Sequence, residues 1–322
     1  MIHSERLLHI VLFGVLIFVA FFVSFSLTQA PSQAATGEVD VENVAPTVIG
    51  DPIVALGALG SEIYPDGIID NLNAGATNRT IWVRGGVEDQ NGFDDFYSVR
   101  VKLYRNDSAC SSFDGNHCYA NTTFGTCTLV PTGGSTIRGD YLCALPLRSW
   151  MDATDADAGA DSDKHFILSV LVDDVDAAST TNTNRTFEVS SFVSVDIPST
   201  IDFGTMSFNT STTSATNVSQ TLTNQGNVVQ DITVSMTDST MACSQSSTGI
   251  DRGNLRWSLT DVDYADSAEM TASTVDTEVN IAKRVSETVA TTDSLFWNLF
   301  VPYGVEGTCS ATITMMAKNG NL

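Results

Sequence analysis

The sequence predicts an all-β protein with two tandem β-sandwich domains that follow an N-terminal hydrophobic helix. After one long apolar run, apolar residues occur only in short alternating or β-branched runs bounded by Gly, Asn, Asp, Ser and Thr, a pattern typical of strands and turns. About six such runs lie on each side of residue 195, which suits one sandwich per half. The cysteines divide at the same point, four before it and two after it, so each half can form its own disulfides.

The first element is the apolar run Leu7 to Leu27, "LLHIVLFGVLIFVAFFVSFSL", which follows a short polar start with one arginine. Such a run predicts a signal peptide or signal anchor, and therefore export of the rest of the chain. Ser32 and Ala34 supply the small residues of a cleavage site after Ala34. The run is also long enough to cross about 30 Å of hydrocarbon as a helix, so cleavage and membrane retention both stay open.

The domain boundaries follow from this leader and from the strand pattern. Residues 1–34 are assigned as signal peptide or signal anchor and 35–45 as a linker. The first domain covers residues 46–195, and its predicted strands are 80–88, 97–105, 126–130, 140–147, 165–173 and 185–195.

The second domain covers residues 196–322. Its predicted strands are 218–224, 228–237, 255–259, 277–285, 295–301 and 309–317. Trp257 and Trp297 are its predicted large core residues. The seam between Val193 and Ser199 contains no long Gly/Ser linker that would make the joint flexible.

Two turns in the second domain have a clear local signal. In "TNQGNVVQDI", Asn224 to Asn227 place a glycine between amide side chains, which predicts a tight turn with positive φ. In "VPYGVEGTC", Pro302 and Gly304 lie between two apolar runs and so end one strand before the next begins.

The six cysteines are interpreted as disulfides because the chain is predicted to be exported. No CxxC occurs, which disfavours a redox pair and a zinc ribbon, and the single nearby histidine, His117, is read as a loop residue. Four cysteines allow three connectivities, and neighbour pairing is the prediction for the first domain. The expected pairs are Cys110–Cys118, Cys127–Cys143 and Cys243–Cys309.

The charge of the chain is strongly acidic, with 38 acidic and 15 basic residues and a formal net charge of −23. Nucleic acid is excluded as a partner, because binding to phosphates needs a basic patch and the sequence has none. An acidic surface of this kind keeps a protein soluble and attracts divalent cations.

Two acidic stretches are candidate Ca²⁺ sites, since oxygen ligands in flexible loops suit this ion. Neither matches the EF-hand spacing, and a solvated acidic loop is the alternative in both cases. Asp173, Asp174 and Asp176 follow a predicted strand and could join either stretch in space. No cofactor is required by any motif. The candidate ligands are Asp89, Asn91, Asp94 and Asp95 in "EDQNGFDD", and Asp152, Asp155 and Asp157, with Asp161 and Asp163, in "DATDADAGADSD".

Six N-x-S/T sequons are spread over both halves, and they make a glycoprotein one expectation for an exported chain. Serine and threonine are so frequent here that several sequons arise by chance. They are Asn78, Asn106, Asn121, Asn184, Asn209 and Asn217.

Longer stretches of the chain resemble known families. "IDFGTMSF", "SQTLTNQGNVVQDITVSM", "LRWSL" and "LFWNLFVPYGVEGTCSATITMMA" resemble a β-sandwich module of secreted and cell-surface proteins from archaea and candidate-phylum bacteria. "VRGGVEDQNGFDDFYSVRVKLY" and "HFILSVLVDDVDAAS" are similar to the immunoglobulin-like modules that accompany it. The resemblance implies immunoglobulin-like sandwiches with an adhesive, structural or envelope (S-layer-associated) role, and it names no ligand.

The expected function is that of a non-enzymatic extracellular protein, a structural or adhesive component of the cell envelope. Its expected partners are envelope proteins or glycans, and the membrane if Leu7–Leu27 is retained. A secreted carbohydrate- or protein-binding module is the alternative. A pilin-like filament subunit is disfavoured because "SERLLH" lacks the glycine that usually stands beside a basic residue at a pilin processing site.

An enzyme is the competing class of function. After the leader only His117 and His165 remain as histidines, and GxSxG, HExxH and a Gly-rich phosphate loop are all missing from the sequence. A glycoside-acting enzyme stays as a lesser alternative, because 38 acidic residues always provide carboxylate pairs.

Overall fold

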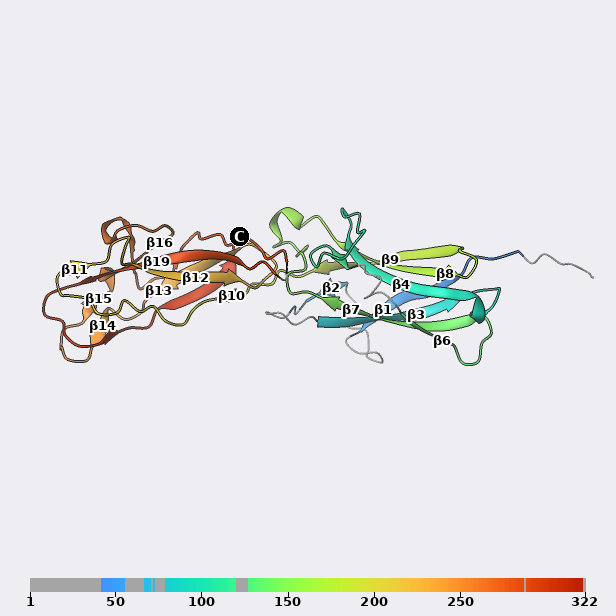
Figure 1. The fold of residues 1–322 in the computed structure, drawn as a ribbon, viewed down its shortest axis with the longest axis horizontal. Helices are drawn as coiled ribbons and strands as arrows, with labels where there is room; N and C mark the ends of the chain where they lie inside the picture. Colours follow the sequence, from blue (N-terminus) through green and yellow to red (C-terminus); the bar gives the residue numbers. More distant parts are fainter. Residues whose placement is uncertain are drawn as a thin grey trace, which may run out of the picture. The chain divides into compact units, whose positions relative to one another are not determined.

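The computed structural model describes residues 42–55, 67–70, 72, 79–119, 127–286 and 288–320. Residues Asn43–Leu322 form one compact unit of strands and loops (Figure 1). Over the described residues the helical pieces are short 3₁₀ turns, so the all-β prediction is confirmed. These turns are η1 Phe93–Asp95, η2 Gly159–Asp161, η3 Arg252–Asn254 and η4 Tyr264–Asp266.

The predicted leader Leu7–Leu27 lies outside the described residues. Within them, no helix combines the length and the apolar character that a bilayer crossing requires.

The N-terminal half, residues 43–194, contains two sheets, and each sheet combines strands that follow one another in the sequence with strands that do not (Figure 1). One sheet has the order β1-β3-β7-β6 and the other β2-β9-β8-β4-β5, and every pair is antiparallel except β2 with β9. The bounds are β1 Thr47–Ala55, β2 Ile68–Ile69, β3 Arg79–Glu88, β4 Phe96–Arg105, β5 Cys118–Tyr119, β6 Thr128–Pro131, β7 Arg138–Leu147, β8 Phe166–Asp174 and β9 Ser179–Val189.

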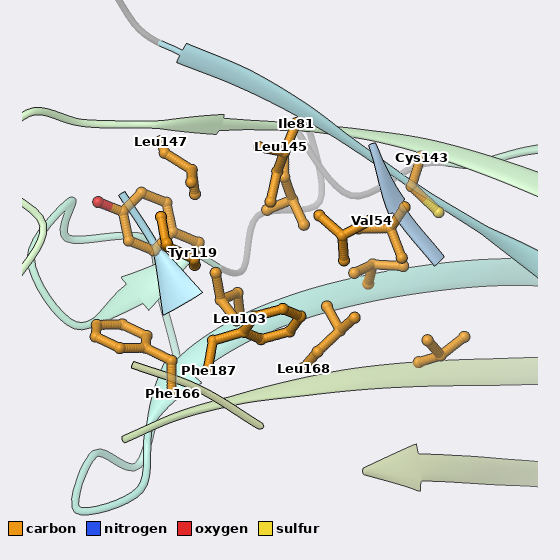
Figure 2. Close-up of a cluster of buried hydrophobic side chains, with 14 of the residues drawn as sticks. Val54, Ile81, Leu103, Tyr119, Cys143, Leu145, Leu147, Phe166, Leu168 and Phe187 are labelled. Carbon is orange, nitrogen blue, oxygen red and sulfur yellow. The ribbon is translucent and has the colours of Figure 1, made fainter. Parts of the chain in front are cut away.

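The core of this half lies between the two sheets. Alternate residues of β3, β4 and β7 point inward, as in β4, where Val99, Val101 and Leu103 are buried. Figure 2 shows Ile81 and Leu145 from one sheet facing the side chains of the other. Two sheets that share one hydrophobic core are the arrangement of a β-sandwich.

The C-terminal half, residues 195–320, contains one sheet of six strands and two sheets of three strands. Their orders are β10-β12-β19-β16-β17 with β11 on β19, β18-β13-β21, and β15-β14-β20. Leu222, Ile232 and the fully buried Trp297 belong to the core that joins the first two sheets. The bounds are β10 Val195–Asp196, β11 Thr210–Ser211, β12 Val218–Asn224, β13 Gln230–Ser235, β14 Thr240–Cys243, β15 Ile250–Asp251, β16 Leu255–Ser258, β17 Ala268–Glu269, β18 Val275–Asp276, β19 Thr291–Val301, β20 Cys309–Ser310 and β21 Thr314–Asn319.

Most predicted strands match the structure, and three differ from the prediction. The strand predicted at 185–195 ends at Val189 as β9, because the chain beyond it bonds to side chains of the C-terminal half. The strand predicted at 277–285 is irregular: Glu278 and Asn280 have positive φ, and the Asp231 carboxylate takes the backbone N–H of Val279. The strand predicted at 309–317 is divided into β20 and β21.

The turn predicted at Asn224–Asn227 connects two strands of different sheets, which differs from the expected tight turn. Strands β12 and β13 belong to different sheets, so the turn carries the chain across the core and forms no hairpin. Gly226 does not have positive φ. A Cβ atom there would collide with the side chain of Gln230 and the carbonyl oxygen of Phe192, so this position needs glycine for space.

The Asn224, Asn227 and Gln230 side chains form a buried amide cluster around this glycine. The Asn224 Oδ1 accepts hydrogen bonds from Gly226 N (2.8 Å) and Gln230 Nε2 (2.7 Å). The Asn227 Oδ1 and the Gln230 Oε1 accept the backbone N–H groups of Phe192 and Ser194. The amide cluster therefore fastens the chain that connects the two halves.

Substitution of Gly226 by alanine is expected to destabilise the protein by about 2 kcal/mol, because the new methyl group has no room beside the Phe192 carbonyl. The measurement is the midpoint of urea unfolding. Gly86→Ala is the matched control, since its Cβ would make only ordinary contacts at 3.5 Å or more. Equal midpoints for the two variants would show that the close packing at Gly226 does not contribute to the stability of the protein.

The structure contains the three disulfides that the sequence analysis favours. They are Cys110–Cys118, Cys127–Cys143 and Cys243–Cys309, each within one half. The first closes a loop beside β5, the second joins the start of β6 to β7, and the third links β14 to β20.

Candidate metal centre

Three carboxylates, two from the loop between β3 and β4 and one from the end of β8, converge at one end of the N-terminal half. Asp89 follows β3, Asp95 ends η1, and Asp174 ends β8. One oxygen of each lies within 4.8 Å of the other two. We call this set the carboxylate triad.

The local sequence explains how these residues meet. The Asp89 Oδ1 accepts the backbone N–H of Asn91 at 2.8 Å, which turns the chain directly after β3. Gly92 then adopts φ 131°, and η1 leads into β4. Because Phe96 pairs with Asp174 in the β4–β8 ladder, the residue before it, Asp95, comes beside the end of β8.

Two of the three triad residues are buried and the third is half-buried, and the group lacks compensating charge. Asp89 and Asp174 are 1% and 2% exposed, and the Oδ2 atoms of Asp89 and Asp95 are buried without a hydrogen-bond partner. Over the described residues, no lysine or arginine forms an ion pair with a triad member. Burial, followed by the negative charges of Asp89 and Asp174, raises the pKa of Asp95.

Asn43, from the segment before β1, contacts the triad through its side-chain amide. Its Nδ2 donates to Asp174 Oδ2 at 2.9 Å, while its Oδ1 is buried and receives no hydrogen bond. The next residue, Val44, donates its backbone N–H to Asn91 Oδ1 at 2.8 Å. Asn43 was not among the predicted ligands, because it lies in the stretch taken to be a linker.

The other predicted ligands of the first acidic stretch lie outside the triad. Asp94 is exposed, and the Asn91 side chain is engaged with Val44. Asp173 pairs with Arg100 at 2.6 Å instead. Asp176 is exposed and contributes only a negative charge near Asp95.

The second acidic stretch has a different role from the predicted one, because most of its carboxylates face cations or backbone N–H groups. Asp152 pairs with Arg105 at 2.9 Å and with Lys283 at 3.0 Å, and Asp161 contacts the same two cations. Asp155 accepts two hydrogen bonds of 2.6 Å from Ser191.

The geometry therefore does not support a Ca²⁺ site at Asp152, Asp155 and Asp157. Asp157 is exposed, and its backbone oxygen takes the side-chain amide of Asn319 at 2.8 Å. Asp163 pairs with Lys164 at 2.8 Å. The sequence could not show this outcome, because Lys283 is more than 100 residues away from this stretch.

A second carboxylate group, Asp231, Asp276 and Glu278, provides a comparison within the same chain. Here Lys318 forms an ion pair with Asp276, and the Asp231 Oδ1 accepts the N–H groups of Ile232 and Val279, both at 2.8 Å. Its charge is compensated within the protein, unlike that of the triad.

The predicted glycosylation sites differ in accessibility. Asn106, Asn184 and Asn209 are exposed. Asn217 is half-buried, and its Nδ2 donates to Asp261 Oδ1 at 2.7 Å, which leaves this nitrogen engaged. Asn78 and Asn121 lie outside the described residues.

A groove of about 670 Å³ lies on the outer face of the sheet that contains β4, β8 and β9. Tyr104 and Lys102 alternate along β4 with the core residues and so face outward, and Lys102 Nζ lies 4.7 Å from the Tyr104 ring centroid. Thr181 and Thr183 add hydroxyl groups from β9. Phe113, from the loop closed by Cys110–Cys118, forms part of the wall.

Comparison with known proteins gives no family assignment. No family model matches the chain, and no curated protein matches it. A solved structure, described as a chaperone–tip adhesin complex in the biogenesis of CFA/I fimbriae, covers 87% of this chain and 90% of its own with 8% sequence identity and a TM-score of 0.29. A likeness at this level carries no argument about fold or function.

Proposed function

We propose that the chain is an exported, non-enzymatic protein of the cell surface, with a structural or adhesive role in the cell envelope. The observation that carries the proposal is the set of three disulfides, which uses every cysteine of the chain. Such bridges persist in oxidising compartments outside the cytoplasm. In this proposal Leu7–Leu27 directs export or anchors the chain, and two immunoglobulin-like domains follow it.

The joint between the halves supports a structural role. Lys283 of the C-terminal half bonds to Asp152 and Asp161 of the N-terminal half, and Asn319 bonds to the backbone of Asp157. The amide cluster of the C-terminal half also binds the backbone N–H groups of Phe192 and Ser194 in the connecting chain. Several polar contacts restrain the connection between the halves, which suits a structural protein that binds envelope proteins or glycans.

The test is surface labelling of the native host cells, followed by intact-mass measurement of the purified chain without reduction. We expect labelling by a reagent that does not enter cells, a mass lower by six hydrogens than that of the thiol form, and added glycan mass at exposed sequons. A chain that is protected inside the cell and carries free thiols contradicts the proposal.

Carbohydrate binding is a second candidate function, because the groove on β4, β8 and β9 combines aromatic rings, hydroxyl groups and a lysine. Tyr104→Ala is expected to weaken binding of a groove-bound saccharide by about tenfold, through loss of ring contact. Binding is measured by calorimetry with glycans purified from the host envelope. Tyr97→Ala is the control, since Tyr97 lies on the same strand, is 76% exposed and is outside the groove. Equal losses in both variants contradict this role.

A further inference from the structure

We propose that the carboxylate triad of Asp89, Asp95 and Asp174, together with Asn43, binds one Ca²⁺ ion and thereby fastens the segment before β1 to the N-terminal half. This inference does not depend on the proposed function.

The electrostatics of the triad favour a bound cation. Three carboxylates lie with their oxygens within 4.8 Å of one another, and two of them are almost fully buried. Isolated charges of the same sign are costly in such a place unless a counter-charge or hydrogen bonds stabilise them. The Oδ2 atoms of Asp89 and Asp95 have neither, although both are shielded from solvent.

The second carboxylate group shows that close acidic residues need not have buried oxygens without partners. The group of Asp231, Asp276 and Glu278 is equally close, yet it has Lys318 and several backbone N–H donors. Of the two groups, only the triad has buried oxygens that lack any partner among the described residues.

The ligand chemistry points to calcium. Every side chain offered is an oxygen donor, with no histidine or cysteine in the group, which suits a hard cation. Ca²⁺ accepts six to eight oxygens in irregular geometry from mono- or bidentate carboxylates, amide oxygens and water. Mg²⁺ demands a near-ideal octahedron and gives up its water reluctantly, so loops from three separate segments suit it less well.

Binding would have a mechanical effect on the chain before β1. The segment at Asn43 and Val44 contacts the rest of the half through Asp174 and Asn91. A bound ion that shares Asn43 with the triad adds a strong link at this place. Hydrogen exchange in residues 43–50 should therefore slow down when Ca²⁺ is present.

The first experiment is a calcium titration of the purified protein, measured by calorimetry. The second is thermal unfolding in Ca²⁺, in Mg²⁺ and in chelator at matched ionic strength. We expect one ion per chain with a Kd of about 10⁻⁴ to 10⁻³ M, as in extracellular modules. Saturating Ca²⁺ should raise Tm by about 5 °C or more, and Mg²⁺ should raise it less.

Asp95→Asn provides the decisive variant, because its two expected effects have opposite signs. Removal of one negative charge from the triad should raise Tm in chelator, since repulsion falls. The same change should weaken Ca²⁺ binding by about tenfold or more, since ligand charge sets affinity. Asn43→Ala should weaken binding without the gain in chelator, and it also abolishes the slowed exchange at residues 43–50.

Asp276→Asn, in the compensated group, is the matched control and should leave Ca²⁺ binding unchanged. The proposal is overturned if no saturable Ca²⁺ binding occurs at millimolar concentration, or if Ca²⁺ and Mg²⁺ shift Tm equally. It is also overturned if Asp276→Asn lowers affinity as much as Asp95→Asn does.

Discussion

Loss of the Cys243–Cys309 bridge through alanine at both positions is expected to lower the free energy of unfolding by about 4 kcal/mol. The bridge joins residues 66 apart in sequence, so it removes far more freedom from the unfolded chain than the bridges that span 8 and 16 residues. Both cysteines are half-buried, so alanine leaves little empty space. Denaturant unfolding under non-reducing conditions measures the change.

The single variants Cys243→Ala and Cys309→Ala control for side-chain effects. Each breaks the same bond, so each should lose nearly as much stability as the double variant, and the effects should not add. Additive losses, or a loss below about 1 kcal/mol in the double variant, would mean that the bridge does not restrain the unfolded chain as proposed.

Asn224→Ala is expected to cost about 3 kcal/mol of stability, because it leaves several buried polar groups without partners. Asn224 is 0% exposed. Its Nδ2 donates to the carbonyl oxygens of Val228 (2.8 Å), Ile281 (3.2 Å) and Ala282 (3.0 Å). Its Oδ1 accepts two further hydrogen bonds within the amide cluster.

The measurement for Asn224→Ala is equilibrium unfolding in urea, with Thr221→Ala as control. Thr221 lies on the same strand but is exposed, so its replacement should change stability by less than about 0.5 kcal/mol. If both variants unfold at the same urea concentration, the amide cluster does not stabilise the C-terminal half.

Local patterns in the sequence predict the strands that alternate. Residues 218–224 were predicted to the residue as β12, and the cores of β3, β4, β7 and β8 follow the same rule. The pattern fails where side chains replace strand pairing, as at Val279, whose N–H binds the Asp231 carboxylate. No periodicity in sequence reports such a contact across 48 residues.

The candidate site shows the same limit. Asp89 and Asp95 could be selected from one acidic turn, and Asp174 was expected to lie within reach of such a stretch. Asn43 could not be identified, since it meets Asp174 across 131 residues through the fold alone. The ion pair of Asp152 with Lys283 likewise forms only through the fold. The acidic composition of this stretch therefore predicted a metal ion at a place where the structure has a lysine side chain.

The pairing of β13 with β21, described above, determines when each half can be completed during synthesis. A nascent chain emerges from its N-terminus, and the N-terminal half possesses all its strands once Val189 has appeared. The C-terminal half has to wait for β19 and β21, which supply partners to β12 and β13. Until Asn319 emerges, the apolar faces of these early strands lack their cover and are open to wrong association. Folding of the later half therefore depends on β19 and β21, whereas the strands of the earlier half are already present.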